Sequence, residues 1–128
     1  MYNVSVKKDF IGHHFLIGGD WGPENQWHAH HYQVEVVLEG ASLDQHGYLV
    51  DISDIEKSMT GLIERYRENT LNDLPEFTDL NPSIEHFSRI FCHAMAKKVE
   101  LPNLTSLTVR IWEEANAWAS YRHSYQCE

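Results

Sequence analysis

The sequence predicts an α+β fold, in which one four-stranded antiparallel sheet carries two helices on one face in the order ββααββ. Four segments towards the two ends of the chain alternate apolar and polar residues with the period of two that is typical of half-buried strands. Two segments in the middle carry apolar residues at helical spacing behind helix-start signals. With 128 residues, 42% of them hydrophobic, the chain has the size of a single domain, residues 1–128.

The first expected element is a strand over residues 2–10, where tyrosine and valine alternate with polar residues. Residues 17–27 contain glycine, proline and asparagine at several positions and favour an irregular loop, which in a small domain is often functional. Residues 30–39 alternate again, with one apolar face and one more polar face. They predict the second strand.

Both middle segments begin with capping signals. Ser53 and Glu56 form the pattern of a capping box at the start of the first helix. Asn81 and Pro82 supply an N-cap and a first-turn residue for the second helix. The apolar stripes behind these signals are Ile55, Met59, Leu62, Ile63 and Tyr66 in the first helix, and Ile84, Phe87, Phe91, Ala94 and Met95 in the second.

The last two expected strands are residues 105–113 and 117–125, which can pair across a turn at 114–116. Two helices cover only one face of such a sheet, and both of its edges lack a neighbouring strand. Because an open edge is prone to pair with another chain, this architecture predicts a homo-oligomer.

Composition excludes some classes of partner. The chain has 19 acidic and 10 basic residues and a net charge of −9, which argues against a nucleic-acid partner. No apolar run is long enough to cross a bilayer, and Lys7, Lys8 and Asp9 lie where a signal peptide needs an apolar stretch. We therefore expect a cytoplasmic protein without a membrane partner, in which Cys92 and Cys127 are free thiols.

Five of the nine histidines fall between residues 13 and 31. Residues two apart on a strand project to the same face, so His28 and His30 can share one metal ion. A third ligand is available from His13 or His14, after the first strand. Three histidines with one open position are the pattern of catalytic zinc. A His-x-His pair on a strand also occurs as ordinary alternation with core residues, and the pattern alone leaves both interpretations open.

The order of these motifs resembles a known family. Residues 10–14, followed by residues 28–32, are similar to the F-x-x-x-H and H-G-H-x-Y elements of the 6-pyruvoyl-tetrahydropterin synthases. That family also contains the 6-carboxytetrahydropterin synthase of queuosine biosynthesis. Residues 47–52, 71–73 and 81–85 are similar to the family's G-x-x-x-D-F, LND and NPTxE elements. Glu113 and Tyr121 are similar to its E-T…Y ending, with Glu114 in place of the threonine.

The resemblance implies the tunnelling fold, or T-fold, in which three subunits close an oligomeric barrel and two such rings can stack. It implies a Zn²⁺ ion held by His14, His28 and His30. The implied substrate is a small reduced pterin, usually 7,8-dihydroneopterin triphosphate, on which zinc acts as a Lewis acid.

The resemblance also implies substrate-binding residues. Glu113 matches the pterin anchor, and a carboxylate can accept two parallel hydrogen bonds from the amino-pyrimidinone edge. Ser83 and Glu85 match positions near the pterin. From the residues alone, Glu113 is equally an exposed acid at a strand end, and Glu85 is favoured in a first helical turn by the helix dipole.

The catalytic residues depart from the family pattern. The family's cysteine is absent, and Glu24 lies four residues before His28, at the spacing of the queuosine-pathway members. A synthase-like subgroup with glutamate here releases 6-hydroxymethyl-7,8-dihydropterin for folate synthesis. Glu24 is therefore a candidate general base, although the residue type alone favours a solvated loop acid. The family's L-D-H relay aligns with residues 66–68, where Glu68 is the candidate proton carrier.

Two other functions stay open from the sequence. A paralogue that keeps the metal but lacks the proton relay would bind a pterin or purine without turnover. Residues 22–35 also fit the first part of a cupin metal motif. The two expected helices argue against an all-β cupin barrel.

Overall fold

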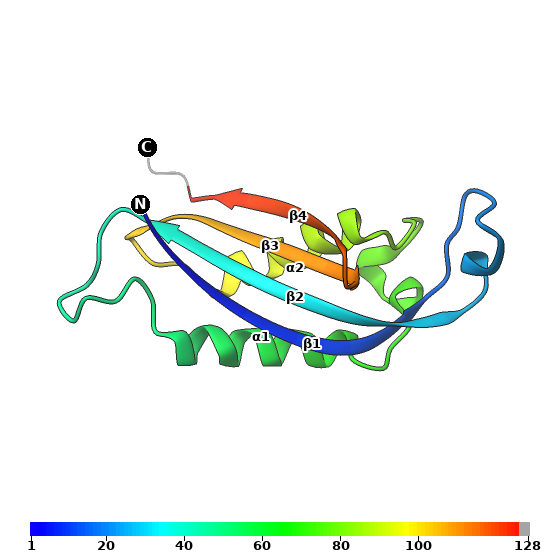
Figure 1. Cartoon of the computed structure of the whole chain (residues 1–128), viewed down its shortest axis with the longest axis horizontal. Helices are drawn as coiled ribbons and strands as arrows, with labels where there is room; N and C mark the ends of the chain where they lie inside the picture. Colours follow the sequence, from blue (N-terminus) through cyan, green and yellow to red (C-terminus); the bar gives the residue numbers. More distant parts are fainter. Residues whose placement is uncertain (126–128) are drawn as a thin grey trace.

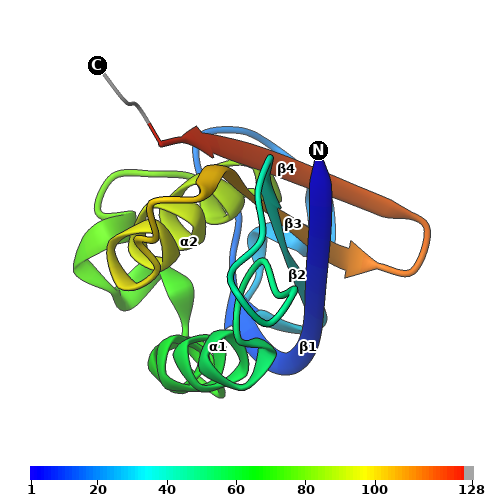
Figure 2. The same cartoon turned by 90° about the vertical axis from the view of Figure 1, so that its left-hand side faces the viewer.

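A computed structural model describes residues 1–125 of the chain. Four strands form one antiparallel sheet in the order β1-β2-β3-β4. Figures 1 and 2 show two long helices on the same side of this sheet. The predicted α+β class and ββααββ order are confirmed. The elements are β1 (Tyr2–His14), β2 (His28–Gly40), α1 (Ile52–Tyr66), α2 (Ile84–Lys98), β3 (Leu104–Glu114) and β4 (Ala117–Ser124).

The core lies between the sheet and the helices. The predicted apolar face of β2 is fully buried, and so is the corresponding face of β3. Phe87 of α2 is central, because its ring meets the rings of Phe10, Tyr32 and Tyr66 edge-on. The buried side chains that face one another are Tyr32, Val34, Val36 and Leu38 from β2, Leu107, Val109 and Ile111 from β3, and Met59, Ile63, Tyr66, Phe91 and Met95 from the helices.

Strands β1 and β2 are longer than the alternation of residue types predicts. Strand β1 continues to His14 and β2 begins at His28, and these two residues are paired at the end of the ladder. The pairing of β2 with β3 begins only at Gln33, so residues 10–14 and 28–32 form a two-stranded extension beyond β3 (Figure 1). Histidine and glycine replace the apolar alternation there, which is why the sequence pattern stops short.

Both predicted helix caps are wrong by two residues. Helix α1 is capped by Asp51, whose carboxylate accepts the backbone N–H of Ser53 at 2.9 Å, and not by a Ser53–Glu56 box. Helix α2 is capped by Ser83, whose hydroxyl accepts the backbone N–H of His86 at 3.1 Å. Asn81 precedes the helix because its side chain bonds elsewhere.

The sheet face opposite the helices is polar. Glu35 accepts a hydrogen bond from Ser5 and forms an ion pair with Arg110. Lys7 lies over the ring of Trp112. Within residues 1–125, β1 and β4 each have one strand neighbour, so both edges are open over most of their length. Near Ile11 and His13, residues 68–70 are hydrogen-bonded to the edge of β1. In this part of the chain, no helix is long and apolar enough to cross a membrane.

Candidate metal centre

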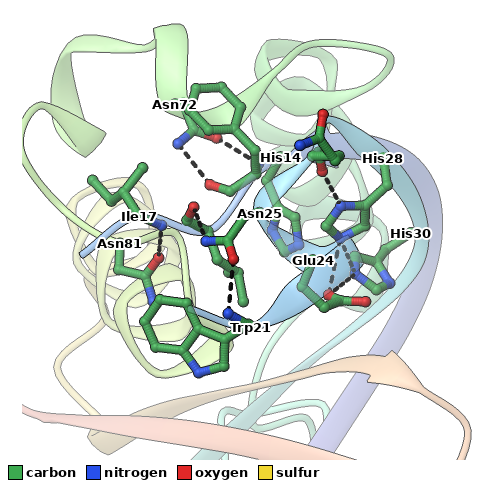
Figure 3. A network of polar contacts seen from close by, with 12 residues as sticks. His14, Ile17, Trp21, Glu24, Asn25, His28, His30, Asn72 and Asn81 are labelled. Carbon is green, nitrogen blue, oxygen red and sulfur yellow. Dashed lines mark hydrogen bonds and ion pairs between the residues drawn. The ribbon is translucent and has the colours of Figure 1, made fainter. Parts of the chain in front are cut away.

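Four side chains converge at the end of the two-stranded extension. His14 closes β1, His28 and His30 open β2, and Glu24 comes from η1 (Gly22–Asn25), a short 3-10 helix in the connecting loop. One potential ligand atom from each lies within 4.8 Å of all the others, and no other such cluster occurs in the described part of the chain. Figure 3 shows Glu24 pointing to His28 and His30 beside His14. The structure thus brings together the three histidines that the sequence pairs with a metal.

His14 is held neutral in the core. Its side chain is buried, and its Nδ1 lies 3.0 Å from the hydroxyl of Tyr32. Burial, together with the neighbouring His30 and His28, lowers its pKa to about 4. Its Nε2 is also buried and has no hydrogen-bond partner among the described residues. A buried polar atom without a partner is costly, and a metal ion would satisfy it.

Nε2 of His28 presents its lone pair to the other members of the cluster. Its Nδ1 lies 2.6 Å from the backbone carbonyl of Gln26, which can only accept, so Nδ1 carries the proton. Its Nε2 then faces the Nε2 of His30 at 3.0 Å and Oε1 of Glu24 at 3.1 Å. Burial and the neighbouring His28 lower the pKa of His30. Imidazole nitrogens and a carboxylate are the donors that zinc takes, and the site therefore fits this ion.

The loop that carries Glu24 is ordered by Asn25. The side-chain amide of Asn25 donates to the carbonyls of Leu16 and Gly19, each at 3.0 Å. Its oxygen accepts the backbone N–H of Trp21 at 2.7 Å (Figure 3). The region predicted as an irregular loop therefore contains η1 and a defined set of turns, although η1 has no buried residue.

Two asparagines from the motifs at residues 71–85 hold the chain directly after His14. Asn72 accepts the backbone N–H of Phe15 at 3.0 Å and donates to its carbonyl at 2.9 Å. Asn81 accepts the backbone N–H of Ile17 at 2.8 Å (Figure 3). From the sequence, Asn81 was expected to cap a helix and Asn72 belonged only to the family resemblance, so the role of both in positioning the chain after His14 was missed. The bonds join segments far apart in sequence, which no local pattern reveals.

Glu113 lies beside the cluster at the end of β3. It occupies the irregularity in the β3–β4 pairing between Trp112 and Glu114. Burial raises the pKa of its carboxyl, and the charges of Glu24 and Glu114 raise it further. The backbone of Glu113 acts on His30 and partly offsets the lowering of the pKa of His30. The structure therefore brings Glu113 and the histidine cluster into one electrostatic neighbourhood.

The remaining predicted site residues lie outside the histidine cluster. Glu85 is exposed in the first turn of α2, and the hydroxyl of Ser83 already caps that helix through His86. Glu68 is exposed after α1 in a left-handed conformation, with φ of 58°, and its backbone N–H donates to the Ile11 carbonyl at 2.7 Å. The structure does not bring the Glu68 side chain to the cluster formed by the described residues.

The neighbouring histidines point away from the cluster. The ring of His13 stacks on Trp27 with centroids 4.5 Å apart, and Trp27 donates to Thr70 at 2.8 Å. His31 pairs with Asp9 at 2.6 Å on the polar face of the sheet. Alternation along the strands explains both orientations.

Comparisons with known proteins concern the family and the fold. The family model described as 6-pyruvoyl tetrahydropterin synthase matches residues 3–124. No match was found among curated protein sequences. The 6-pyruvoyl tetrahydropterin synthase of Plasmodium vivax is 15% identical, with a TM-score of 0.82, over 97% of this chain and 98% of that chain. The enzyme of Caenorhabditis elegans is 20% identical, with a TM-score of 0.81, over 96% of each chain.

A further similar structure is a Plasmodium vivax synthase described as a catalytic-residue mutant, in which a glutamate is replaced by alanine. It is 14% identical, with a TM-score of 0.79, and the match covers 97% of this chain and 98% of that chain. At these identities the likeness concerns the fold. The sheet with two helices described above is the fold of these structures.

Proposed function

The chain belongs to the 6-pyruvoyl tetrahydropterin synthase family, and on this basis we propose that it is a zinc-dependent lyase acting on a reduced dihydropterin. The proposed substrate is 7,8-dihydroneopterin triphosphate or a related compound. One observation carries the proposal: ligand atoms of three imidazoles and of the Glu24 carboxylate lie within 4.8 Å of one another, beside Glu113. The T-fold supplies the scaffold.

His14, His28 and His30 would hold the zinc ion. When bound, zinc supplies Lewis-acid polarisation of the substrate's side-chain oxygens and so acidifies the neighbouring C–H and O–H groups. Burial lowers the pKa of His14 and of His30. Nδ1 of His14 is hydrogen-bonded to the Tyr32 hydroxyl, and Nδ1 of His28 donates to the Gln26 carbonyl. Such bonds fix the tautomer that offers a lone pair.

Glu113 would anchor the pterin ring. Its carboxyl is half-buried and next to other acids, so its pKa is raised in the free protein. Two N–H donors of the amino-pyrimidinone edge would compensate its charge through parallel hydrogen bonds. Ser83 and Glu85, at the start of α2, are proposed as further contacts of the substrate.

Glu24 would act as the general base. Its Oε1 lies 3.1 Å from Nε2 of His28, and 48% of its side chain is exposed, so it borders the open side of the cluster. From there it can take a proton from a bound substrate. The Plasmodium vivax structure described above also has a glutamate as its catalytic residue, which supports this role. Glu68 is the proposed second proton carrier, although no described contact joins its side chain to the cluster.

A second product is favoured by one specific feature. Glu24 occupies the place where most family members have cysteine, and the resemblance links glutamate there to release of 6-hydroxymethyl-7,8-dihydropterin. Such a product would serve folate synthesis, whereas a 6-carboxy product would serve queuosine synthesis.

The test is incubation of the purified, zinc-loaded protein with 7,8-dihydroneopterin triphosphate, followed by identification of the product by mass. We expect turnover that Glu24→Gln abolishes and that Glu114→Gln, a neighbouring exposed acid, leaves near the wild-type rate. His28→Ala should also reduce the zinc content. Tight binding of the pterin without any product would refute the lyase in favour of a non-catalytic binding protein.

The active form is proposed to be a trimer or a dimer of trimers. The support is the open edge at β1 and at β4 and the polar sheet face that no helix covers in the described residues. Exposed Tyr2 and Ile11 on β1 add apolar surface at that edge. Size-exclusion chromatography with light scattering measures the assembly, and a monomer at micromolar concentration would contradict it.

A further inference from the structure

The four residues of the cluster are not equally fixed. The three histidines project from paired strands, and the side chains of His28 and His30 are 21% and 14% exposed. Glu24 comes from η1, which has no buried residue, and its side chain is 48% exposed. Its carboxylate can therefore swing by side-chain rotation alone.

The backbone at Glu24 is nevertheless anchored. The Glu24 carbonyl accepts the backbone N–H of Leu16 at 3.0 Å, and the adjacent Asn25 makes three hydrogen bonds within the loop. This arrangement resists movement of the whole loop and returns the carboxylate to the same position. The cluster therefore combines three fixed histidines with one acid, Glu24, whose side chain can move.

Three of the distances between the donor atoms are close to those of a closed four-ligand site, and the donor atoms of all four residues lie within 4.8 Å of one another. In a tetrahedral zinc site with ligands about 2.0–2.1 Å from the ion, neighbouring ligand atoms lie about 3.3–3.4 Å apart. Nε2 of His28 lies 3.0 Å from Nε2 of His30 and 3.1 Å from Oε1 of Glu24. Oε1 of Glu24 lies 3.9 Å from Nε2 of His30. Small shifts of these side chains would bring all three separations to the tetrahedral value.

We propose that Glu24 is a displaceable fourth ligand, which closes the metal site in the absence of substrate and leaves it when the oxygens of a substrate enter. The released carboxylate then lies beside the substrate and is free to act as the base. One residue thus links site opening to proton abstraction. The inference rests on the zinc site of the proposed function, but it concerns the resting protein and needs no turnover.

The competing explanation is a simple ion pair between Glu24 and a protonated His28. The two explanations differ in the metal-bound protein without any pterin. A ligand contributes to metal affinity and to coordination geometry, whereas an ion pair with a histidine that binds the metal is lost on binding. Metal titration of the pterin-free protein therefore separates them.

The experiment compares the wild type with Glu24→Gln, Glu24→Ala and Glu114→Gln. Zinc affinity is measured by chelator competition, and the cobalt(II) forms are compared by visible absorption, which is more intense for four-coordinate tetrahedral cobalt than for higher coordination numbers. We expect zinc affinity to fall about tenfold or more in both Glu24 variants. We also expect their cobalt bands to weaken or shift.

Glu114→Gln is the matched control, because it removes a charge that acts on His30 but lies on the exposed end of β3. Screening by solvent and salt should limit its effect to about twofold, with an unchanged cobalt spectrum. Circular dichroism verifies the fold of each variant, and the isosteric Glu24→Gln keeps the test valid if the alanine variant unfolds.

Adding 7,8-dihydroneopterin should change the wild-type cobalt spectrum to that of a site from which Glu24 has been displaced. Unchanged zinc affinity and an unchanged cobalt spectrum in Glu24→Gln would overturn the inference, even if the enzyme is active. A wild type whose metal binding depends on Glu24 but that forms no pterin product would instead refute only the lyase.

Discussion

Tyr32→Phe tests whether the core of the protein supports the metal site. Tyr32 is fully buried, its ring stacks on Phe10 with centroids 5.4 Å apart, and its hydroxyl lies 3.0 Å from Nδ1 of His14. Phenylalanine keeps the ring and its packing, so the substitution removes only the hydroxyl. His14 then has no described hydrogen-bond partner at Nδ1, and burial keeps water away.

The magnitude follows from that loss. A buried polar atom left without its partner costs about 1–3 kcal/mol of stability. For a chain of this size the melting temperature should fall by roughly 3–8 °C for a loss of 1–2 kcal/mol. Zinc affinity should fall about 10- to 100-fold, because partners of this kind orient a ligating histidine and fix its tautomer. Urea unfolding of the metal-free protein and chelator competition measure the two effects separately.

Tyr66→Phe is the control. Tyr66 is also buried, its ring lies in the same core, and its hydroxyl donates to Oε2 of Glu76 at 2.9 Å, away from the histidines. It should lose a similar amount of stability and keep the zinc affinity of the wild type. Equal zinc affinity in Tyr32→Phe and Tyr66→Phe would refute the reasoning, whatever their stabilities.

Three further predictions follow from the site. Asn72→Ala removes two hydrogen bonds to the backbone of Phe15 and should cost about 1–3 kcal/mol in urea unfolding, with weaker zinc binding. In the metal-free protein the pKa of His14 is lowered to about 4, so the unfolded chain binds the proton first. Stability should therefore decrease as pH falls from about 6.5 to about 4, by at most about 1.4 kcal/mol per pH unit, and His14→Gln should flatten this dependence in pH-dependent unfolding. Glu113→Gln should weaken pterin binding at least tenfold in calorimetry while zinc affinity stays near the wild-type value, because Glu113 is outside the ligand cluster.

The fold was largely predictable because burial leaves a periodic pattern. Residues 30–39 alternate cleanly, and the predicted apolar face of β2 is fully buried. The strand ends were not predictable from this pattern. Residues 10–14 and 28–32 are paired, but histidine and glycine interrupt the alternation of apolar and polar residues there. The predictions of the helix caps were wrong for another reason. Asp51 and Ser83 are good caps that lie close to equally good candidates in the sequence, and only the backbone geometry selects between them.

The residues of the site also differ in how far the sequence predicts them. His28 and His30 were predictable because the spacing of two along a strand fixes a common face. Tyr32 was predicted only as a core residue, although its hydroxyl reaches His14 on the neighbouring strand. Asn72 reaches Phe15 across 57 residues of chain. Partners that arise from tertiary packing leave no local signal, so the sequence predicts the proposed ligands but not the residues that support them.

Glu24 and Glu68 show the limit of carrying a residue over by alignment. Both stand where the family has a catalytic residue, and the sequence gives no physical reason to separate them. Glu24 lies in a short turn leading directly into β2, so its distance from His28 is set by four residues of local chain and survives a change of side chain from cysteine to glutamate. Glu68 follows α1 with φ of 58°, and its position depends on how that helix packs. A proposed base that lies four residues from a proposed metal ligand keeps its position when its side chain changes, whereas a proton relay between distant segments depends on how both segments pack.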